Sequence, residues 1–339
     1  MSQKPNTLTA KLLSGDLITL EAKTPKEFCE KYLETHVKKK FRPFTSVYWE
    51  DGTILVNTHP LPKWVDETKL NWEGLSGIIP AHHLAFLEEN RDKVDWSRLS
   101  ANPAVLPLLE KHQDKVDWSR LSQNRSPDAI RLLEQNLDKV DWKFLSANPV
   151  AIPLLEAYPE NIHWMYLSMN SSPLALPLLE ANVDKVHWGF LSKNPSAFPI
   201  LEKNLSNVDL YEFSRNPAAL PVLEAIPMFI KWYTLSMNPA AISLLKANPK
   251  RIYWLHFSSN SSPEAVPIWR ANGKRLDWMY LSRNPVAIEL LWENPNRVEW
   301  SYASENPAAL RLLEKNQEKI DYERFSKNPA IFCPPLDDF

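Results

Sequence analysis

The sequence predicts a mainly α-helical solenoid built from tandem repeats, preceded by a small amino-terminal α+β domain. Two observations carry most of this prediction: a tryptophan-centred motif recurs along most of the chain, and the first 60 residues follow a different pattern. Composition agrees, because there are only six glycines against 29 prolines and 14 tryptophans, an imbalance that few globular domains show. With 44% hydrophobic and 24% charged residues, the chain can bury a core and is not expected to be disordered.

The amino-terminal segment, residues 1–59, has the pattern of a ββαββ domain. Apolar residues recur on both sides of Ser14-Gly15-Asp16, which predicts a β-hairpin. A capping box with proline at the first helical position, Thr24 to Glu27, predicts a helix through about His36. Asp51-Gly52 predicts the turn of a second hairpin. We expect residues 60–71 to be a linker.

The remainder, residues 72–339, is predicted to be a repeat array. Its unit reads approximately Asp-Trp-x-x-Leu-Ser-x-Asn-Pro-x-Ala-Ile-Pro-Leu-Leu-Glu-x-Asn-x-Asp-Lys-Val, and successive units start 22 or 24 residues apart. The first and last units are irregular, as expected of units that cap a solenoid. The motif starts at Trp72, Trp96, Trp118, Trp142, Trp164, Trp188, Leu210, Trp232, Trp254, Trp278, Trp300 and Tyr322.

Each unit is expected to contain two short helices. Trp96 and Leu99 share one face of a single turn, which the preceding aspartate caps. Asn102 and Pro103 have the pattern of an N-cap and a first helical position, so a second helix begins there. A further proline, Pro107, has equivalents in other units and leaves the exact start of this second helix undecided. Neither helix buries its apolar face alone, so the units must stack into a superhelix of short α/3₁₀ pairs.

The repeated tryptophans are interpreted as structural core, because they keep a regular spacing with leucine. Exposed tryptophans would instead offer stacking platforms for nucleic acid bases. The Ser-x-Asn pair of each unit, from Ser100 and Asn102 to Ser326 and Asn328, is predicted to cap helices. The predicted core tryptophans are Trp96, Trp118, Trp142, Trp164, Trp188, Trp232, Trp254, Trp278 and Trp300.

The units also resemble known repeats. The segment from Asn124 to Glu134 is similar to the leucine-rich variant repeat, a right-handed solenoid of alternating α- and 3₁₀-helices. More closely, LSANPVAIPLLEAYPENIHW and its copies resemble LSxNPxAIxLLExNxDKxDW repeat proteins of large DNA viruses of algae and amoebae, over about residues 72 to 333. The resemblance implies a right-handed superhelix, a viral source and an interaction role more than any activity. Leu210 and Ala303 depart from the pattern.

Two positions after each tryptophan the residue varies, which predicts exposure. Phe144, Tyr166 and Phe190 would then form one aromatic strip and Tyr280 with Tyr302 a second, of the kind that anchors protein partners. The alternative is that these side chains pack against the adjacent unit. The sequence therefore favours a non-enzymatic scaffold that binds a protein whose identity it does not reveal.

A nucleic-acid-binding repeat protein is the second hypothesis. It would use Arg98 and Arg120 together with one basic run, whose possible phosphate contacts are Lys38, Lys39, Lys40 and Arg42. With 39 basic and 41 acidic side chains the chain has no strong overall field, and one short basic run is usually a solvated helix end. Nucleic acid is thus an unlikely partner.

The sequence gives no reason to predict catalysis, a metal or a cofactor. Its histidines lack metal-ligand spacing, Cys29 and Cys333 form no pattern, and no phosphate loop or nucleophile motif occurs. An enzyme confined to the amino-terminal domain is the least supported alternative. No signal segment or membrane span is visible, so we expect an intracellular soluble protein, in host cytoplasm or virion if viral.

Overall fold

The computed structural model describes residues 7–12, 17–21, 44–49, 61–62, 64–80 and 83–332. Its amino-terminal part contains a sheet of order β2-β1-β3, with strands β1 (Thr7–Leu12), β2 (Leu17–Glu21) and β3 (Phe44–Trp49). The antiparallel pairing of β1 with β2 agrees with the first predicted hairpin. β1 also pairs antiparallel with β3. The predicted helix and the last strand of the ββαββ pattern lie outside the described residues.

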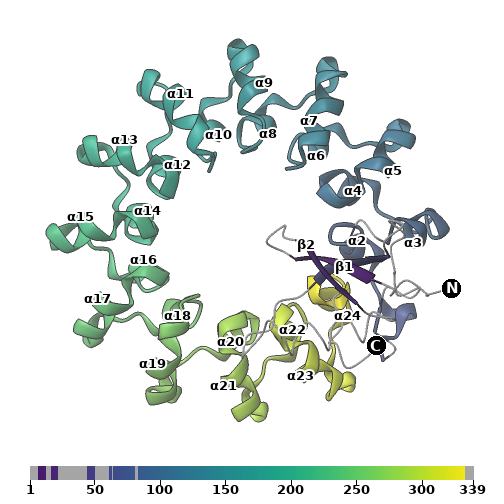
Figure 1. Ribbon diagram of the computed structural model, residues 1–339. Helices are drawn as coiled ribbons and strands as arrows, with labels where there is room; N and C mark the ends of the chain where they lie inside the picture. Colours follow the sequence, from purple (N-terminus) through teal and green to yellow (C-terminus); the bar gives the residue numbers. More distant parts are fainter. Residues whose placement is uncertain are drawn as a thin grey trace.

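Two concentric rows of short helices make up the rest of the molecule (Figure 1). The inner row begins each repeat and consists of α2 (Trp72–Ser76), α4 (Trp96–Ala101), α6 (Trp118–Leu121), α8 (Trp142–Ser146), α10 (Trp164–Leu167), α12 (Trp188–Ser192), α14 (Leu210–Arg215), α16 (Trp232–Leu235), α18 (Trp254–Phe257), α20 (Trp278–Arg283), α22 (Trp300–Ser304) and α24 (Tyr322–Phe325). The outer row consists of α3 (Leu84–Glu89), α5 (Leu106–Lys111), α7 (Pro127–Glu134), α9 (Ile152–Ala157), α11 (Leu176–Ala181), α13 (Phe198–Lys203), α15 (Leu220–Ala225), α17 (Ile242–Ala247), α19 (Val266–Ala271), α21 (Ile288–Glu293) and α23 (Leu310–Glu314).

The second repeat shows how the motif builds both helices. Asp95 caps α4, its carboxylate accepting from the Arg98 amide at 2.9 Å. Asn102 caps the 3₁₀-helix η3 (Pro103–Val105), its side chain accepting from the Ala104 amide at 3.0 Å. Both predicted caps are confirmed. Because asparagine and proline close a tight 3₁₀ turn, the predicted second helix is divided into η3 and α5.

The second proline of the unit sits in the first turn of the outer helix. Pro107 is the second residue of α5, where the missing N–H costs little because first-turn amides have no helical acceptor. The same division into a 3₁₀-helix and an α-helix occurs at α17, whose second residue is Ser243. This proline therefore fits the break in the helix rather than causing it.

A continuous apolar core runs through all the repeats, from Leu61 to Phe332. Each unit adds its inner-helix leucine and its outer-helix leucines, such as Leu99 and Leu109. Part of the segment that was expected to be a linker belongs to this core, since Leu61, Val65 and Leu70 are all buried in it.

Buried polar groups connect each repeat to the next. The Ser100 hydroxyl donates to the Trp96 carbonyl at 2.7 Å and accepts from the Asp117 amide of the following unit at 3.0 Å. Asn124 of that unit donates back to the Ser100 carbonyl at 3.0 Å. The serine and asparagine of the motif thus do more than cap helices, because they satisfy backbone groups across the junction between units.

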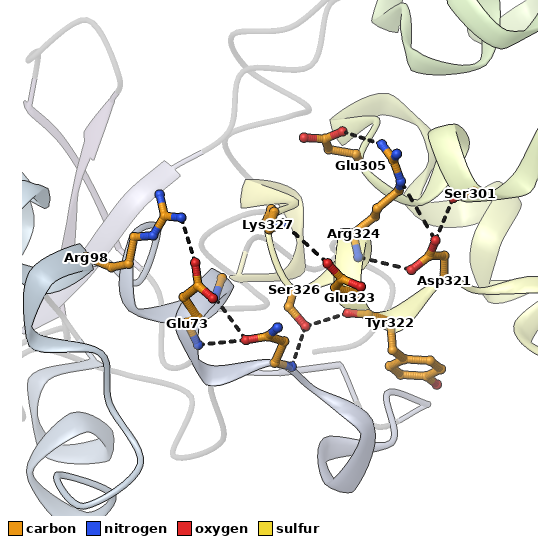
Figure 2. Close-up of polar contacts among 12 residues, drawn as sticks. Glu73, Arg98, Ser301, Glu305, Asp321, Tyr322, Glu323, Arg324, Ser326 and Lys327 are labelled. Atoms are coloured by element: carbon orange, nitrogen blue, oxygen red, sulfur yellow. Dashed lines mark hydrogen bonds and ion pairs between the residues drawn. The ribbon is translucent and has the colours of Figure 1, made fainter.

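The same serine contact joins the last repeat to the first. The Ser326 hydroxyl accepts from the Asn71 amide at 2.7 Å, and Asn71 precedes Trp72 as Asp95 precedes Trp96. Figure 2 shows this junction, with Glu73 and Ser326 on facing segments. We call it the seam and define it as the contact of residues 61–62, 64–80 and 83 with residues 322–332. Its ring contacts are Trp64 with Phe325 at 5.7 Å, Lys69 with Tyr322 at 5.4 Å and His83 with Phe332 at 5.8 Å.

The repeats therefore close into a ring, with α24 beside α2 (Figure 1). The sequence led us to expect an open superhelix whose irregular first and last units cap its two ends. Instead these two units contact each other. Their irregularity is consistent with this contact, since a Cβ on Gly74 would lie 2.9 Å from the Ser326 carbonyl oxygen. The first unit thus carries glycine where the others carry a side chain.

Candidate interaction surface

The first predicted aromatic strip lies on inner-row helices but is only half exposed. Phe144 and Tyr166 contact each other edge to face, with ring centroids 6.0 Å apart, across the junction of α8 and α10. The Lys143 ammonium lies 5.5 Å from the Phe144 ring and 5.1 Å from the Tyr166 ring. The two rings therefore pack across the junction of neighbouring units, as the alternative expected, and both side chains stay partly exposed. Their role in binding a partner remains a prediction.

Phe190, the third member of that strip, makes no ring contact with Phe144 or Tyr166 among the described residues. It packs on His187 at 4.6 Å and lies 5.1 Å from the Lys193 ammonium. Tyr280 and Tyr302 are not in ring contact with each other among the described residues. Tyr280 is 37% exposed, whereas Tyr302 is half-buried with the Arg324 guanidinium 4.4 Å from its ring centre.

A more exposed group of aromatic side chains lies on α14 and α16 and at the start of α18. Tyr211, Tyr233 and Tyr253 are 56%, 46% and 51% exposed. The Tyr233 ring lies 5.5 Å from Tyr253 and 3.9 Å from His256. Leu255, beside them, is also exposed. We call Tyr211, Tyr233, Tyr253, Leu255 and His256 the tyrosine cluster.

Sequence reasoning missed most of this cluster because it considered only the position two residues after the tryptophan. A signal was nonetheless present. The position immediately after it is occupied by glutamate, serine, lysine, methionine or glycine in preceding units, and by Tyr211, Tyr233 and Leu255 in three consecutive ones. Large apolar or aromatic residues that replace small or flexible ones on an exposed face mark a surface used for contact.

Two buried polar atoms in this sector have no hydrogen-bond partner among the described residues. They are Oε2 of Glu212, on α14, and Nδ1 of His256, on α18. Such groups are rare, because burial without a partner costs free energy. Desolvation, and then the charge of Arg215, lower the pKa of His256 below its usual value.

The repeated tryptophans pack half-buried against the core, which agrees with the structural role predicted for them. A cation from the end of the same unit lies over many of these rings, so those indole faces are not free for stacking on bases. The rings and cations are Trp118 with Lys139 at 4.4 Å, Trp164 with Lys185 at 4.9 Å, Trp254 with Arg275 at 5.4 Å, Trp278 with Arg297 at 4.4 Å and Trp300 with Lys319 at 4.5 Å.

The basic groups suggested for nucleic acid do not form one track in the described residues. The Arg98 guanidinium is paired with the Glu73 carboxylate at 2.6 Å, as Figure 2 shows. This hydrogen bond, followed by the charge of Arg98, lowers the pKa of Glu73. Arg120 is exposed. Lys38, Lys39, Lys40 and Arg42 lie outside the described residues.

No helix among the described residues is both long and apolar enough to cross a membrane. Those same residues contain no group of three or more histidine, cysteine, aspartate or glutamate side chains placed to hold a metal ion.

Comparisons with known proteins add no relative. No protein-family model, curated protein or solved structure matches the chain.

Proposed function

We propose that this protein is a non-enzymatic, ring-shaped repeat scaffold that binds another protein through the tyrosine cluster. The observation that carries the proposal is the exposure of Tyr211 on α14, Tyr233 on α16 and Tyr253 at the N-cap of α18, which are successive inner helices. Tyrosines give rigid contact area with few rotatable bonds, and they are enriched among the residues that dominate binding energy.

Contacts among the rings of the cluster support a preordered binding surface. The Tyr233 ring lies 5.5 Å from the Tyr253 ring and 3.9 Å from the His256 ring, so these side chains restrict one another's rotation. Side chains that are ordered before binding lose less conformational entropy when a partner binds.

The test compares the full chain with a variant in which Tyr211, Tyr233 and Tyr253 are all changed to serine. Proteins retained by the wild type are identified by mass spectrometry, purified and titrated against both forms by calorimetry. Losing interface anchors worth about 2 kcal/mol or more lowers affinity by roughly 30-fold or more. A Leu174→Ser, Met228→Ser variant is the control, because both side chains are exposed but lie outside the cluster.

Unchanged affinity in the triple tyrosine variant would refute the proposal. Binding of nucleic acid with a steep loss on added salt would favour the second hypothesis instead. The resemblance of the repeats to proteins of large DNA viruses supports a further proposal, that the scaffold is a viral structural or host-interaction protein in host cytoplasm or virion. The right-handed path of the repeats rests on resemblance too.

A further inference from the structure

A pocket of about 310 Å³ lies next to the tyrosine cluster, where the ends of α10, α12 and α14 meet. Phe190 and Met169 provide its apolar lining, and Lys193 and Arg215 its charged groups. Arg215 also connects the two regions, because α14 carries Tyr211 near its start and Arg215 at its end. The pocket and the cluster are therefore parts of one surface.

The two cations of the pocket have no acidic partner. Neither the Lys193 ammonium nor the Arg215 guanidinium lies within 4.0 Å of a carboxylate oxygen in the part of the chain that the structure describes. Both occupy the position between the serine and asparagine of the motif. Two other units carry a basic residue at this position, and both of these are paired: Arg283 with Glu305 at 3.4 Å and Lys327 with Glu323 at 4.0 Å.

Other polar atoms around the pocket are already engaged. The side-chain nitrogen of Asn194 donates to the Ser168 and Asn170 carbonyls, at 3.2 and 2.8 Å, and its side-chain oxygen accepts from the Ser196 amide at 3.1 Å. The Ser171 carbonyl accepts from the Ser196 hydroxyl at 2.7 Å. What the pocket offers a ligand is thus two cations beside an aromatic ring and a methionine.

We propose that this pocket receives an acidic side chain of the bound protein, with the residue beside it packed on Phe190 and Met169. The proposal rests on the proposed function and extends it by giving the partner's chemistry. A carboxylate accepts charge-assisted hydrogen bonds from both cations, and the planar fork of arginine matches its two oxygens. Two cations beside Glu212 do not form the long basic track that a nucleic acid backbone needs.

The experiment uses two pools of short synthetic peptides that carry a fluorophore and are randomised except at the centre. One pool has glutamate between leucine and phenylalanine, and the other has glutamine there. Binding to the full chain is followed by fluorescence anisotropy. The glutamate pool is expected to bind about tenfold tighter or more, the difference that one hydrogen bond to a charged group makes.

The matched variants locate this preference. Lys193→Gln with Arg215→Gln is expected to abolish the difference between the pools, whereas Arg283→Gln retains it because Arg283 is already paired with Glu305. Inorganic phosphate, compared with sodium chloride at equal ionic strength, tests whether the pocket is a site for free anions. If phosphate displaces the peptides fully and sodium chloride does not, the pocket is a phosphate site and the proposal is wrong.

Equal binding of the two pools, or absence of binding by both, also overturns the acidic-anchor proposal. That outcome is separable from failure of the proposed function, which depends on the triple tyrosine variant and an identified partner. The pocket variants keep Tyr211, Tyr233 and Tyr253, so a partner that still needs these tyrosines but is indifferent to Lys193 and Arg215 preserves the first proposal and removes the second.

Discussion

The Ser326 hydroxyl accepts a hydrogen bond from the Asn71 amide at 2.7 Å, a contact between residues 255 positions apart in the chain. It repeats the contact that Ser100 makes with Asp117 between consecutive units. The last repeat therefore contacts the first in the same way that each repeat contacts the one that follows it in the chain. The asparagine half of the junction is absent, because Ile78 stands where later units have Asn102 or Asn124. The seam thus lacks one of the links that the other junctions have.

Gly74→Ala tests the ring directly. The added methyl group would lie 2.9 Å from the Ser326 carbonyl oxygen, so we expect a loss of about 1 to 3 kcal/mol in the free energy of unfolding. Within α2 alone the same change would favour the helix by about 1 kcal/mol. Chemical denaturation therefore distinguishes the two states: the free energy of unfolding falls if the ring is closed and rises if it is open. Gly273→Ala is the control, since nothing lies within 4 Å of its added methyl group.

Ser326→Ala and Ser214→Ala remove equivalent hydroxyls at the seam and at an internal junction. Ser214 donates to the Leu210 carbonyl at 2.7 Å and accepts from the Lys231 amide at 2.9 Å, much as Ser326 does with Tyr322 and Asn71. In each variant we expect the free energy of unfolding to fall by about 1 to 3 kcal/mol, because a buried amide loses its hydrogen-bond acceptor.

Hydrogen exchange separates these two serine variants. The Asn71 amide should exchange faster in Ser326→Ala than in Ser214→Ala, and the Lys231 amide should show the opposite order. If Asn71 exchanges at the solvent-exposed rate in the wild type as well, the seam is not closed in solution.

Changing Phe144 and Tyr166 to serine should lower stability, whereas changing Tyr233 to serine should not. The first two rings are half-buried and packed edge to face at 6.0 Å, so their joint loss is expected to cost about 2 to 4 kcal/mol. Tyr233 is 46% exposed, and a surface change usually alters stability by about 0.5 kcal/mol or less. Thermal melts of both variants provide the measurement, and equal melting temperatures would contradict this division of roles.

Acidification should destabilise the sector around His256. Desolvation and then Arg215 lower its pKa in the folded protein, so the unfolded chain takes up the proton more readily. The stabilising effect of neutral His256 is present above the unfolded value of about 6.5 and is lost as the pH falls through the folded pKa. NMR titration of the imidazole should give a higher pKa in Arg215→Gln than in the wild type. An unchanged pKa would show that the charge of Arg215 does not affect the His256 imidazole.

The repeat architecture could be predicted from the sequence because interactions within each unit determine it. An aspartate before the tryptophan and an asparagine before proline cap helices wherever they occur, and the structure places Asp95 and Asn102 in these roles. Ring closure was not readable, because it depends on the small rotation between neighbouring units added up around the whole array. Only Gly74, in a position that otherwise carries a side chain, hinted at a close approach.

The candidate surface was predicted in part. Exposure was inferred from variation at one motif position, which identified Phe144 and Tyr166 but gave them more exposure than they have. Pairwise packing between neighbouring inner helices decides which ring is covered, and a single repeat does not contain that information. Tyr211 and Tyr233 were overlooked since they occupy the adjacent position.

Closure at Asn71 and Ser326 makes the number of repeats a fixed property of the molecule. An open array can gain or lose a unit at either end and keep every remaining junction intact. In this ring, deleting one internal unit would leave a gap as wide as a repeat, which all other junctions would have to bend to close. Cutting the chain between two repeats and joining its present ends by a suitable linker, in contrast, would keep the same circle of contacts. Circular permutants should therefore fold where single-repeat deletions fail.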